Sequence, residues 1–233
     1  MNHFIEKQLM SGLPNVRLEA VKYVIAHESG NPKNCGPDAL ERELAYMNKN
    51  KANAFTSHWV GDGGRIVQVA PVGKVQYGCG PKGNPLSYAQ VELARTNDKE
   101  QFKKDYAAYI WLLRKLAKEA GIPVVLDGTG NGIKSHRWIT NNLGGTTHVD
   151  PFAYLQSMGI SEAQFKSDIL NGLEEVKETQ FTEAKVMLND VKSIPAVIID
   201  GRTHVQVREL ADLLGLKIVY NNESKITKLY EVK

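Results

Sequence analysis

A short polar segment holds several side chains that can bind a metal ion. Within residues 134–155, "KSHRWITNNLGGTTHVDPFAYL", His136 and Asp150 lie at the two ends of a glycine-rich loop that can fold them together, and His148 lies between them. Neutral imidazoles and carboxylates are common zinc ligands, and a catalytic zinc takes three protein ligands and leaves a position for water. A metal site here therefore needs a further ligand from a distant part of the chain.

Two candidates that could complete this chemistry lie in earlier parts of the chain. "VKYVIAHES" (21–29) predicts a buried strand that ends at His27, and Glu92 lies among apolar neighbours in the predicted strand "AQVELAR" (89–95). A histidine at a strand end is more often structural, so a ligand and a structural role both stay open for His27. Burying a carboxylate is costly, and service as a general base is one reason to do so. Without HExxH or another close-spaced zinc signature, spacing alone does not decide.

The elements around these residues predict an α/β domain. "FTSHWVGDGGRIVQVAP" (55–71) predicts two strands around a turn in which Asp62, Gly63 and Gly64 supply the positive φ angles. Apolar residues at helical spacing predict a helix over 99–120, and Gly121 ends it. Strands interleaved with helices favour a mixed central β-sheet flanked by helices.

The last third of the chain changes character. A helix is predicted from Ser161, which begins a capping box, to about residue 177, and the polar stretch "EEVKETQFTE" (174–183) predicts a linker or the frayed end of that helix. Strand patterns then flank the helical pattern "VRELADLLG", and two short strands surround "NNES". We therefore predict a larger domain over 1–175 and a small C-terminal α+β module over 176–233.

Composition and charge exclude several classes of protein. The 29 basic and 26 acidic residues give a net charge of +3 and are scattered, which is not the basic stripe of a nucleic-acid-binding protein. Cys35 and Cys79 have no CxxC spacing, so a disulfide framework is not expected. No apolar run is long enough for a membrane span, and the N-terminal residues lack the apolar core of a signal peptide. We therefore expect synthesis in the cytoplasm.

Five segments together resemble a known family. In order they are "YVIAH", "TSHWVGDGGRIVQVAP", "QVELAR", "GIKSHRWIT" and "HVDP". Over roughly residues 15–160 the chain resembles the zinc-dependent N-acetylmuramoyl-L-alanine amidases of the type 2 family, which includes phage endolysins and is related to peptidoglycan-recognition proteins. The family pattern is a strand ending in a histidine, a glutamate on a later strand, a second histidine, and Cys-Pro or Asp-Pro. The matching positions are His27, Glu92, His136 and Asp150 with Pro151.

The resemblance implies a site and leaves one choice in it. One zinc ion would be held by His27, His136 and Asp150. The 13 residues between His136 and Asp150 form a longer loop than is common in the family, so His148 is an alternative third ligand. Pro151 matches the family pattern and favours Asp150. His148 then takes the position at which the family usually has a lysine that stabilises the oxyanion, and an imidazole N–H can serve there.

The resemblance also implies a reaction and its substrate. The expected activity is hydrolysis of the amide between N-acetylmuramic acid and L-alanine in bacterial peptidoglycan by a zinc-activated water, with Glu92 as general base. Trp59, Tyr77 and Trp138 are the expected substrate-binding residues, although packing is the more common fate of a tryptophan. At "QYGCG" (76–80) the chain lacks the histidine that many relatives carry.

Other functions stay open from the sequence. The main alternative is a non-catalytic peptidoglycan-recognition protein, which in this family is distinguished by loss of the third ligand. A bacterial autolysin or a prophage relic would have the same chemistry. The missing signal peptide favours a phage endolysin that reaches the wall through a holin-made pore.

The C-terminal module has a resemblance of its own. Through "DGRT" and "VRELADLLG" it is similar to a small domain beside copper amine oxidase-like and other cell-surface proteins of spore-forming bacteria. Its single histidine, His204, argues against copper chemistry. The resemblance implies a location at cell walls, where the module would bind wall polymer or mediate self-association.

Overall fold

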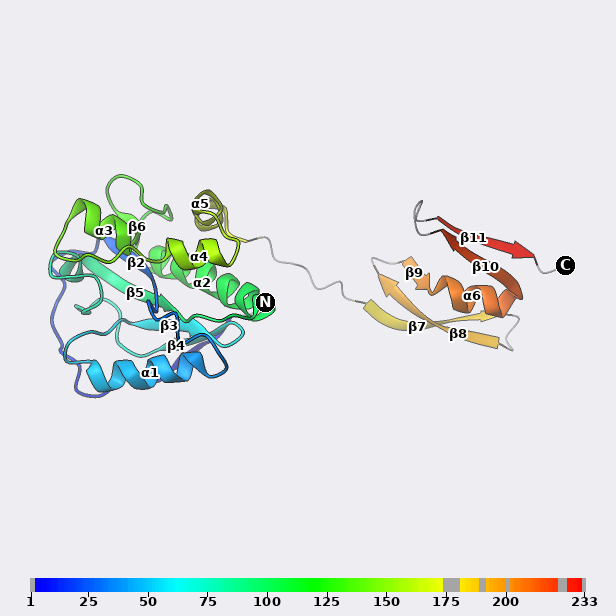
Figure 1. The fold of residues 1–233 in the computed structure, drawn as a ribbon, viewed down its shortest axis with the longest axis horizontal. Coiled ribbons are helices and arrows are strands. Elements are labelled where there is room, and N and C mark those ends of the chain that lie inside the picture. Colours follow the sequence, from blue (N-terminus) through cyan, green and yellow to red (C-terminus); the bar gives the residue numbers. More distant parts are fainter. Residues whose placement is uncertain (1–2, 174–180, 189–191, 200–201, 222–225, 232–233) are drawn as a thin grey trace. The chain divides into compact units, whose positions relative to one another are not determined.

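The structure is a computed structural model that describes residues 3–173, 181–188, 192–199, 202–221 and 226–231 (Figure 1). The chain divides into two compact units, 1–174 and 175–233. Most of the predicted linker, residues 174–180, lies outside the described residues. The predicted C-terminal boundary of the linker, residue 183, is wrong, because residues 181–183 belong to a strand.

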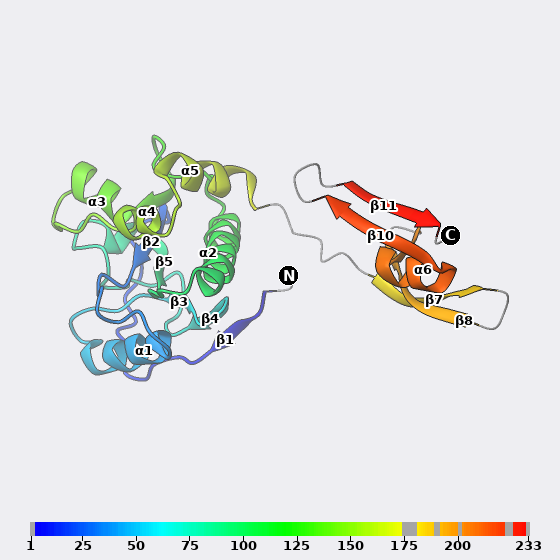
Figure 2. The same cartoon turned by 45° about the vertical axis from the view of Figure 1, so that its right-hand side comes forward.

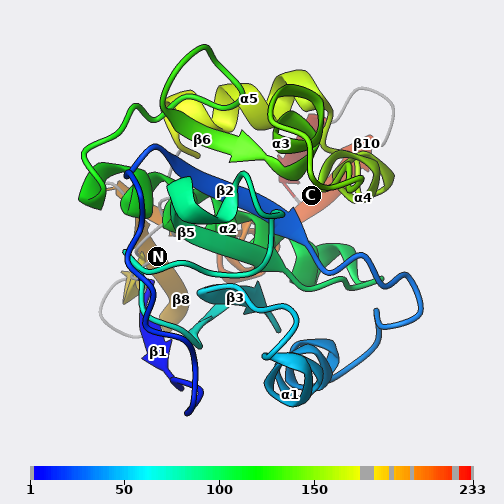
Figure 3. The same ribbon diagram turned by 90° about the vertical axis from the view of Figure 1, so that its left-hand side faces the viewer.

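The first unit is built on a six-stranded mixed sheet, as the sequence predicts. The strand order is β1-β4-β3-β5-β2-β6, and only the β3–β4 pairing is antiparallel (Figure 3). The strands are β1 (Ile5–Lys7), β2 (Tyr23–Glu28), β3 (His58–Gly61), β4 (Arg65–Gln68), β5 (Ser87–Leu93) and β6 (Gly132–Ser135). The parallel strands β2, β5 and β6 therefore end at the same edge of the sheet.

Among the described residues of this unit, five α-helices and a short 3-10 helix accompany the sheet. The helices are α1 (Ala39–Asn50), α2 (Lys99–Glu119), α3 (His136–Asn142), α4 (Phe152–Ser157) and α5 (Glu162–Asn171), and the 3-10 turn is Asn84–Leu86. The Asp98 side chain caps α2 by accepting hydrogen bonds from two backbone amides of the first turn. Gly121, at φ 66°, follows its end, so the predicted helix is confirmed.

The two faces of the sheet are covered differently (Figure 2). Helix α2 packs on β5, β2 and β3 and forms the main core on one face. On the other face, α1 covers the β3 side through Leu40, Met47 and Trp59, and α3 covers the β2 side through Ile139. The middle of this second face lies between the two helices, over β5 and β2. It carries the functional side chains described below.

Helix α2 also holds the β3–β4 hairpin in place. The turn residues Asp62, Gly63 and Gly64 have φ angles of 54°, 82° and 94°, as predicted. Asp105 of α2 is 1% exposed and accepts a 2.6 Å hydrogen bond from the Gly64 backbone N–H. Burial raises the pKa of the Asp105 carboxyl to about 6, and the hydrogen bond from Gly64 only partly offsets this.

Asp105→Asn should therefore change the pH dependence of stability. The folded pKa of about 6 lies above the unfolded value of 3.8, so the stability linked to protonation is present at low pH and is lost as the pH rises through 6. Relative to the wild type, the Asn variant should gain about 2 to 3 kcal/mol in free energy of unfolding between pH 4 and 7. Urea unfolding of both proteins across this range measures the change. A constant difference between them would contradict a raised pKa.

Helix α5 is shorter than predicted. The Ser161 Oγ caps it by accepting a 3.1 Å hydrogen bond from the Gln164 backbone N–H, as expected. The helix ends at Asn171 rather than near residue 177. The next residue, Gly172, adopts φ 83°, a conformation that interrupts a right-handed helix.

The second unit is the small α+β module predicted from the sequence. The strands β7 (Phe181–Leu188), β8 (Lys192–Ile199) and β9 (Arg202–Val205) form one antiparallel sheet, and β10 (Leu216–Asn221) pairs with β11 (Ile226–Glu231). Helix α6 (Val207–Leu214) contacts β8 and β10. Within the described parts of both units, no helix has the length and apolar character needed to cross a membrane.

Candidate metal centre

Strand register places two of the predicted site residues together. In the parallel pairing of β2 with β5, His27 is the direct partner of Glu92, so both side chains lie on the same face near the carboxyl ends of their strands. His136 is the first residue of α3 and follows β6, the other neighbour of β2. The Ser135 Oγ caps α3 by accepting a 3.0 Å hydrogen bond from the Trp138 backbone N–H. This cap holds the start of the helix beside His27.

Asp150 reaches the two histidines from the loop between α3 and α4. Its Oδ2 lies 3.2 Å from His27 Nδ1, and its Oδ1 lies 3.1 Å from His136 Nδ1. One donor atom from each of the three residues lies within 4.8 Å of the others. Two imidazole nitrogens and a carboxylate oxygen are the donor set of many catalytic zinc sites. These side chains form a group that could hold a metal ion.

The charge states of the group suit a cation. Burial acts to raise the pKa of Asp150, but hydrogen bonds from His136 and His27 outweigh it and hold the pKa below its ordinary value. Burial lowers the pKa of His136 more than the hydrogen bond to Asp150 raises it. Asp150 is therefore a carboxylate and His136 is neutral at pH 7, the protonation states in which both bind metals.

The second nitrogen of each imidazole has its own partner. His27 Nε2 lies 3.2 Å from Gln90 Oε1, and His136 Nε2 lies 2.9 Å from Thr146 Oγ1. Both Nε2 atoms are therefore engaged away from Asp150, and both Nδ1 atoms face it. Such partners on the outer nitrogen are typical of metal-ligating histidines.

Glu92 contains an unpartnered buried oxygen. Its residue surface is partly exposed, but Oε2 is shielded from solvent and has no hydrogen-bond partner among the described residues. Burial, followed by the negative charge of Asp150, raises the pKa of Glu92 well above its ordinary value. An unpaired carboxylate next to a second carboxylate is unfavourable unless a cation or a polar ligand joins them. The site residues therefore fit a bound metal ion.

His148 lies next to this group but outside it. Its side chain is 71% exposed, and its Nδ1 is 4.0 Å from Asp150 Oδ1. The imidazole stacks on His136, with ring centroids 4.9 Å apart. The structure therefore groups Asp150, and not His148, with His27 and His136.

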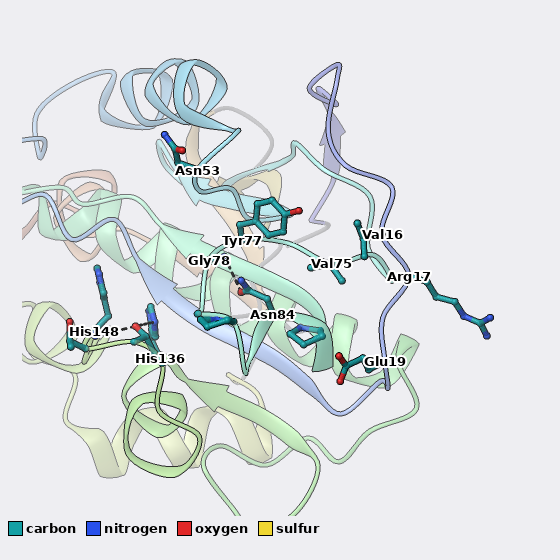
Figure 4. Close-up of a pocket in the computed structure, with 16 residues that line it drawn as sticks. Val16, Arg17, Glu19, Asn53, Val75, Tyr77, Gly78, Asn84, His136 and His148 are labelled. Atoms are coloured by element: carbon teal, nitrogen blue, oxygen red, sulfur yellow. Dashed lines mark hydrogen bonds between the residues drawn. The ribbon is translucent and has the colours of Figure 1, made fainter.

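An open groove begins at the histidines. The pocket has a volume of about 1060 Å³, and His136 and His148 lie at one end while Arg17 and Glu19 lie at the other (Figure 4). Residues from the turn after α1, the segment 75–85 and the loop 145–148 line it.

The three aromatic residues expected to bind substrate differ in position. Tyr77 lines the groove. Trp59 is 3% exposed and packs against α1, with its Nε1 3.2 Å from Met47 Sδ, so its ring is not presented to a substrate. Trp138 packs beside Tyr23 and under the ammonium group of Lys134, 4.4 Å from the ring centroid. These contacts favour packing for both tryptophans.

Gln90 and Thr146, the partners of the outer imidazole nitrogens, were not predicted from the sequence. One signal was available for Gln90: it precedes Glu92 by two residues in a strand, which places both side chains on the same face. Thr146 lies in the loop whose path no local pattern predicts. Its contact with His136 appears only in the structure.

Two histidines, an aspartate and a glutamate with one buried carboxylate oxygen lie together near the strand ends of a mixed sheet. This arrangement is suited to metal-assisted hydrolysis. The family described as N-acetylmuramoyl-L-alanine amidase matches residues 17–152, and the chain belongs to this family. This confirms the resemblance of residues 15–160. The resemblance proposed for the C-terminal module stays a prediction.

Two phage proteins are similar to this chain in sequence. The chain is 50% identical over 173 residues to the endolysin of Listeria phage A511, and the aligned region covers 72% of this chain and 50% of that relative. It is 43% identical over 171 residues to the lytic amidase of Streptococcus pneumoniae phage HB-3, and the aligned region covers 71% of this chain and 52% of that relative. The chain therefore spans about half the length of these curated relatives.

Solved structures confirm the fold. The structure of the Staphylococcus aureus hydrolase AmiA in complex with its ligand has a TM-score of 0.66 and 25% identity, over 73% of this chain and 83% of that chain. A mutant endolysin from Bacillus subtilis has a TM-score of 0.53 and 18% identity, over 72% of this chain and 99% of that chain.

Proposed function

We propose that this protein is a peptidoglycan hydrolase that cleaves the amide between N-acetylmuramic acid and the L-alanine of the stem peptide. Membership of the amidase family and the similarity to a phage endolysin and a phage lytic amidase support this activity. The observation that carries it is the convergence of His27, His136 and Asp150 donor atoms beside the unpartnered carboxylate of Glu92.

His27 and His136, each through Nδ1, and Asp150 would hold one zinc ion. Bound zinc polarises a carbonyl oxygen and lowers the pKa of water toward about 7. The protein contributes a carboxylate and two imidazoles whose outer nitrogens are held by Gln90 and Thr146. A substrate amide would enter from the groove, whose wall includes His136.

Glu92 would move the proton. The attacking water transfers a proton to the Glu92 carboxylate as its oxygen bonds to the amide carbon. Glu92 then delivers that proton to the amide nitrogen, the C–N bond breaks, and the L-alanine amine leaves. The raised pKa of Glu92 suits this exchange because a base must also become an acid within one turnover.

His148 would support the oxyanion of the tetrahedral intermediate. Its exposed imidazole stacks on His136 at the end of the groove, so an N–H can point toward the substrate. One well-placed donor of this kind typically contributes about 10²- to 10³-fold to turnover.

A digest of purified Gram-positive peptidoglycan tests the proposal. The full chain is incubated with the wall polymer, with and without a zinc chelator, and the products are analysed by mass spectrometry. Stem peptides beginning with L-alanine should appear only without chelator, and zinc added back should restore them. Intact polymer to which the protein still binds would instead establish a recognition protein. The presence of Asp150 in the cluster favours the enzyme.

The biological setting and the domain roles form part of the proposal. Phage relatives support an enzyme that is made in an infected cell and acts on the wall after release. We assign catalysis to residues 1–175. Residues 176–233 would bind wall polymer or mediate self-association. Partly exposed side chains of Tyr220 and Tyr230 on β10 and β11 supply aromatic surface for such a contact.

A further inference from the structure

Gln90 makes a buried contact with a proposed metal ligand. It lies on β5 two residues before Glu92, on the same face, and is 0% exposed. Its Oε1 is 3.2 Å from His27 Nε2, on the far side of the imidazole from Asp150. A buried carboxamide beside an imidazole can act as acceptor or donor, so its orientation decides the effect on His27.

The surroundings fix the orientation of this carboxamide. Gln90 Nε2 lies 3.3 Å from the Gln76 carbonyl oxygen and 3.3 Å from Asn84 Oδ1. The first partner can only accept. Asn84 Oδ1 also accepts from the backbone N–H groups of Gly78 and Cys79, which identifies it as the oxygen. The amide nitrogen of Gln90 therefore faces these two oxygens, and its Oε1 faces His27.

The backbone around Gln90 is equally constrained. Its N–H donates to Gln76 Oε1 at 2.9 Å and to Ser57 Oγ at 3.1 Å. A Cβ at Gly78 would lie 2.3 Å from Gln90 Oε1, so only glycine leaves the carboxamide in place. The side chain cannot turn or shift without breaking several contacts.

We infer that Gln90 is a positioning residue: its Oε1 accepts a hydrogen bond from His27 Nε2–H and so holds the imidazole with Nδ1 toward the metal ion. Because Gln90 Oε1 can only accept, it favours a proton on Nε2, which is the tautomer that His27 needs to bind a metal ion through Nδ1. Asp150 Oδ2 favours a proton on Nδ1 until a metal ion binds there. The partner of His136 makes no such choice, since the Thr146 hydroxyl can donate or accept. This inference rests on the proposed metal centre.

Loss of the Gln90 acceptor should weaken metal binding. Without it, a proton on Nε2 has no partner, and the tautomer that donates from Nδ1 to Asp150 Oδ2, 3.2 Å away, becomes more favourable. Zinc must then displace this hydrogen bond and the proton. Partners of this kind typically contribute about 10- to 100-fold to metal affinity.

The test compares two buried glutamines in the full-length protein. Gln90→Met keeps the length of the side chain and removes the acceptor for His27. Gln76→Met is the matched control: it removes one support of the Gln90 backbone but retains the carbonyl that orients the carboxamide. Zinc affinity is measured by competition with a chromogenic chelator, and thermal unfolding of the metal-free proteins monitors their folding. Gln90→Met should lose about 10- to 100-fold in zinc affinity, and Gln76→Met should remain near the wild type.

A second measurement needs no variant. Imidazole ¹⁵N chemical shifts of the zinc-loaded wild type should show His27 bound to zinc through Nδ1 and protonated at Nε2. The opposite tautomer would overturn the inference, and so would wild-type zinc affinity in folded Gln90→Met. If the wild type itself binds no zinc, the proposed metal centre fails. If the wild type binds zinc and Gln90→Met binds it equally, only the positioning role fails.

Discussion

Glu92→Gln should reduce amide hydrolysis by about 10²- to 10⁴-fold, the usual contribution of a general base, and leave zinc affinity unchanged. The carboxamide has the shape of the carboxylate but cannot accept a proton. Release of L-alanine-terminated peptides measures the rate, and chelator competition measures the affinity. Glu100→Gln, on the exposed first turn of α2, is the matched control and should retain full activity.

The same variant should be at least as stable as the wild type. The wild type carries a buried carboxylate oxygen without a partner, and the charge of Asp150 adds repulsion. Gln removes the carboxyl group that Asp150 repels when it is ionised, so the thermal midpoint of the metal-free protein should not fall. Near-normal turnover in Glu92→Gln would show that another group accepts the proton. Lost activity together with a lower midpoint would point to a structural role.

Asp150→Asn should weaken metal binding, whereas His148→Gln should leave it unchanged. Asp150→Asn removes the carboxylate that faces both Nδ1 atoms, so zinc affinity should fall by more than the roughly 100-fold expected for an outer-shell partner. His148→Gln should keep near wild-type affinity and lose about 10²- to 10³-fold in turnover.

Both variants are measured by the same chelator competition and peptide-release assays. Together the two variants decide whether Asp150 or His148 is the third metal ligand. The sequence left this choice open because the loop after His136 is long. Retained zinc in Asp150→Asn together with lost zinc in His148→Gln would reverse the assignment.

The sequence predicted those parts of the fold that depend on local patterns. The strand ending at His27, the hairpin turn at Asp62 to Gly64 and the helix before Gly121 all follow from apolar spacing and backbone preferences of nearby residues. That His27 and Glu92 are partners depends on the order of strands in the sheet, and a strand pattern alone does not contain that order. The family resemblance supplied this part of the site.

Trp59 shows why the substrate-binding residues were harder to predict. Strand alternation places it on the same face as Glu92, its partner in the β3–β5 pairing. Helix α1 covers that part of the face, and the sequence analysis did not predict this helix. Whether a side chain on the correct face is accessible depends on the packing of elements distant in sequence.

The groups around the proposed metal ion come from two kinds of backbone. His27, Gln90 and Glu92 belong to the sheet, whereas Asp150 and Thr146 belong to a loop whose residues 145–148 also form the wall of the groove. Changes in that loop that adapt the groove to a different wall polymer would therefore also alter how firmly the metal is retained. Arg17 lies at the other end of the groove, away from this loop, so substitutions there should leave metal affinity unchanged.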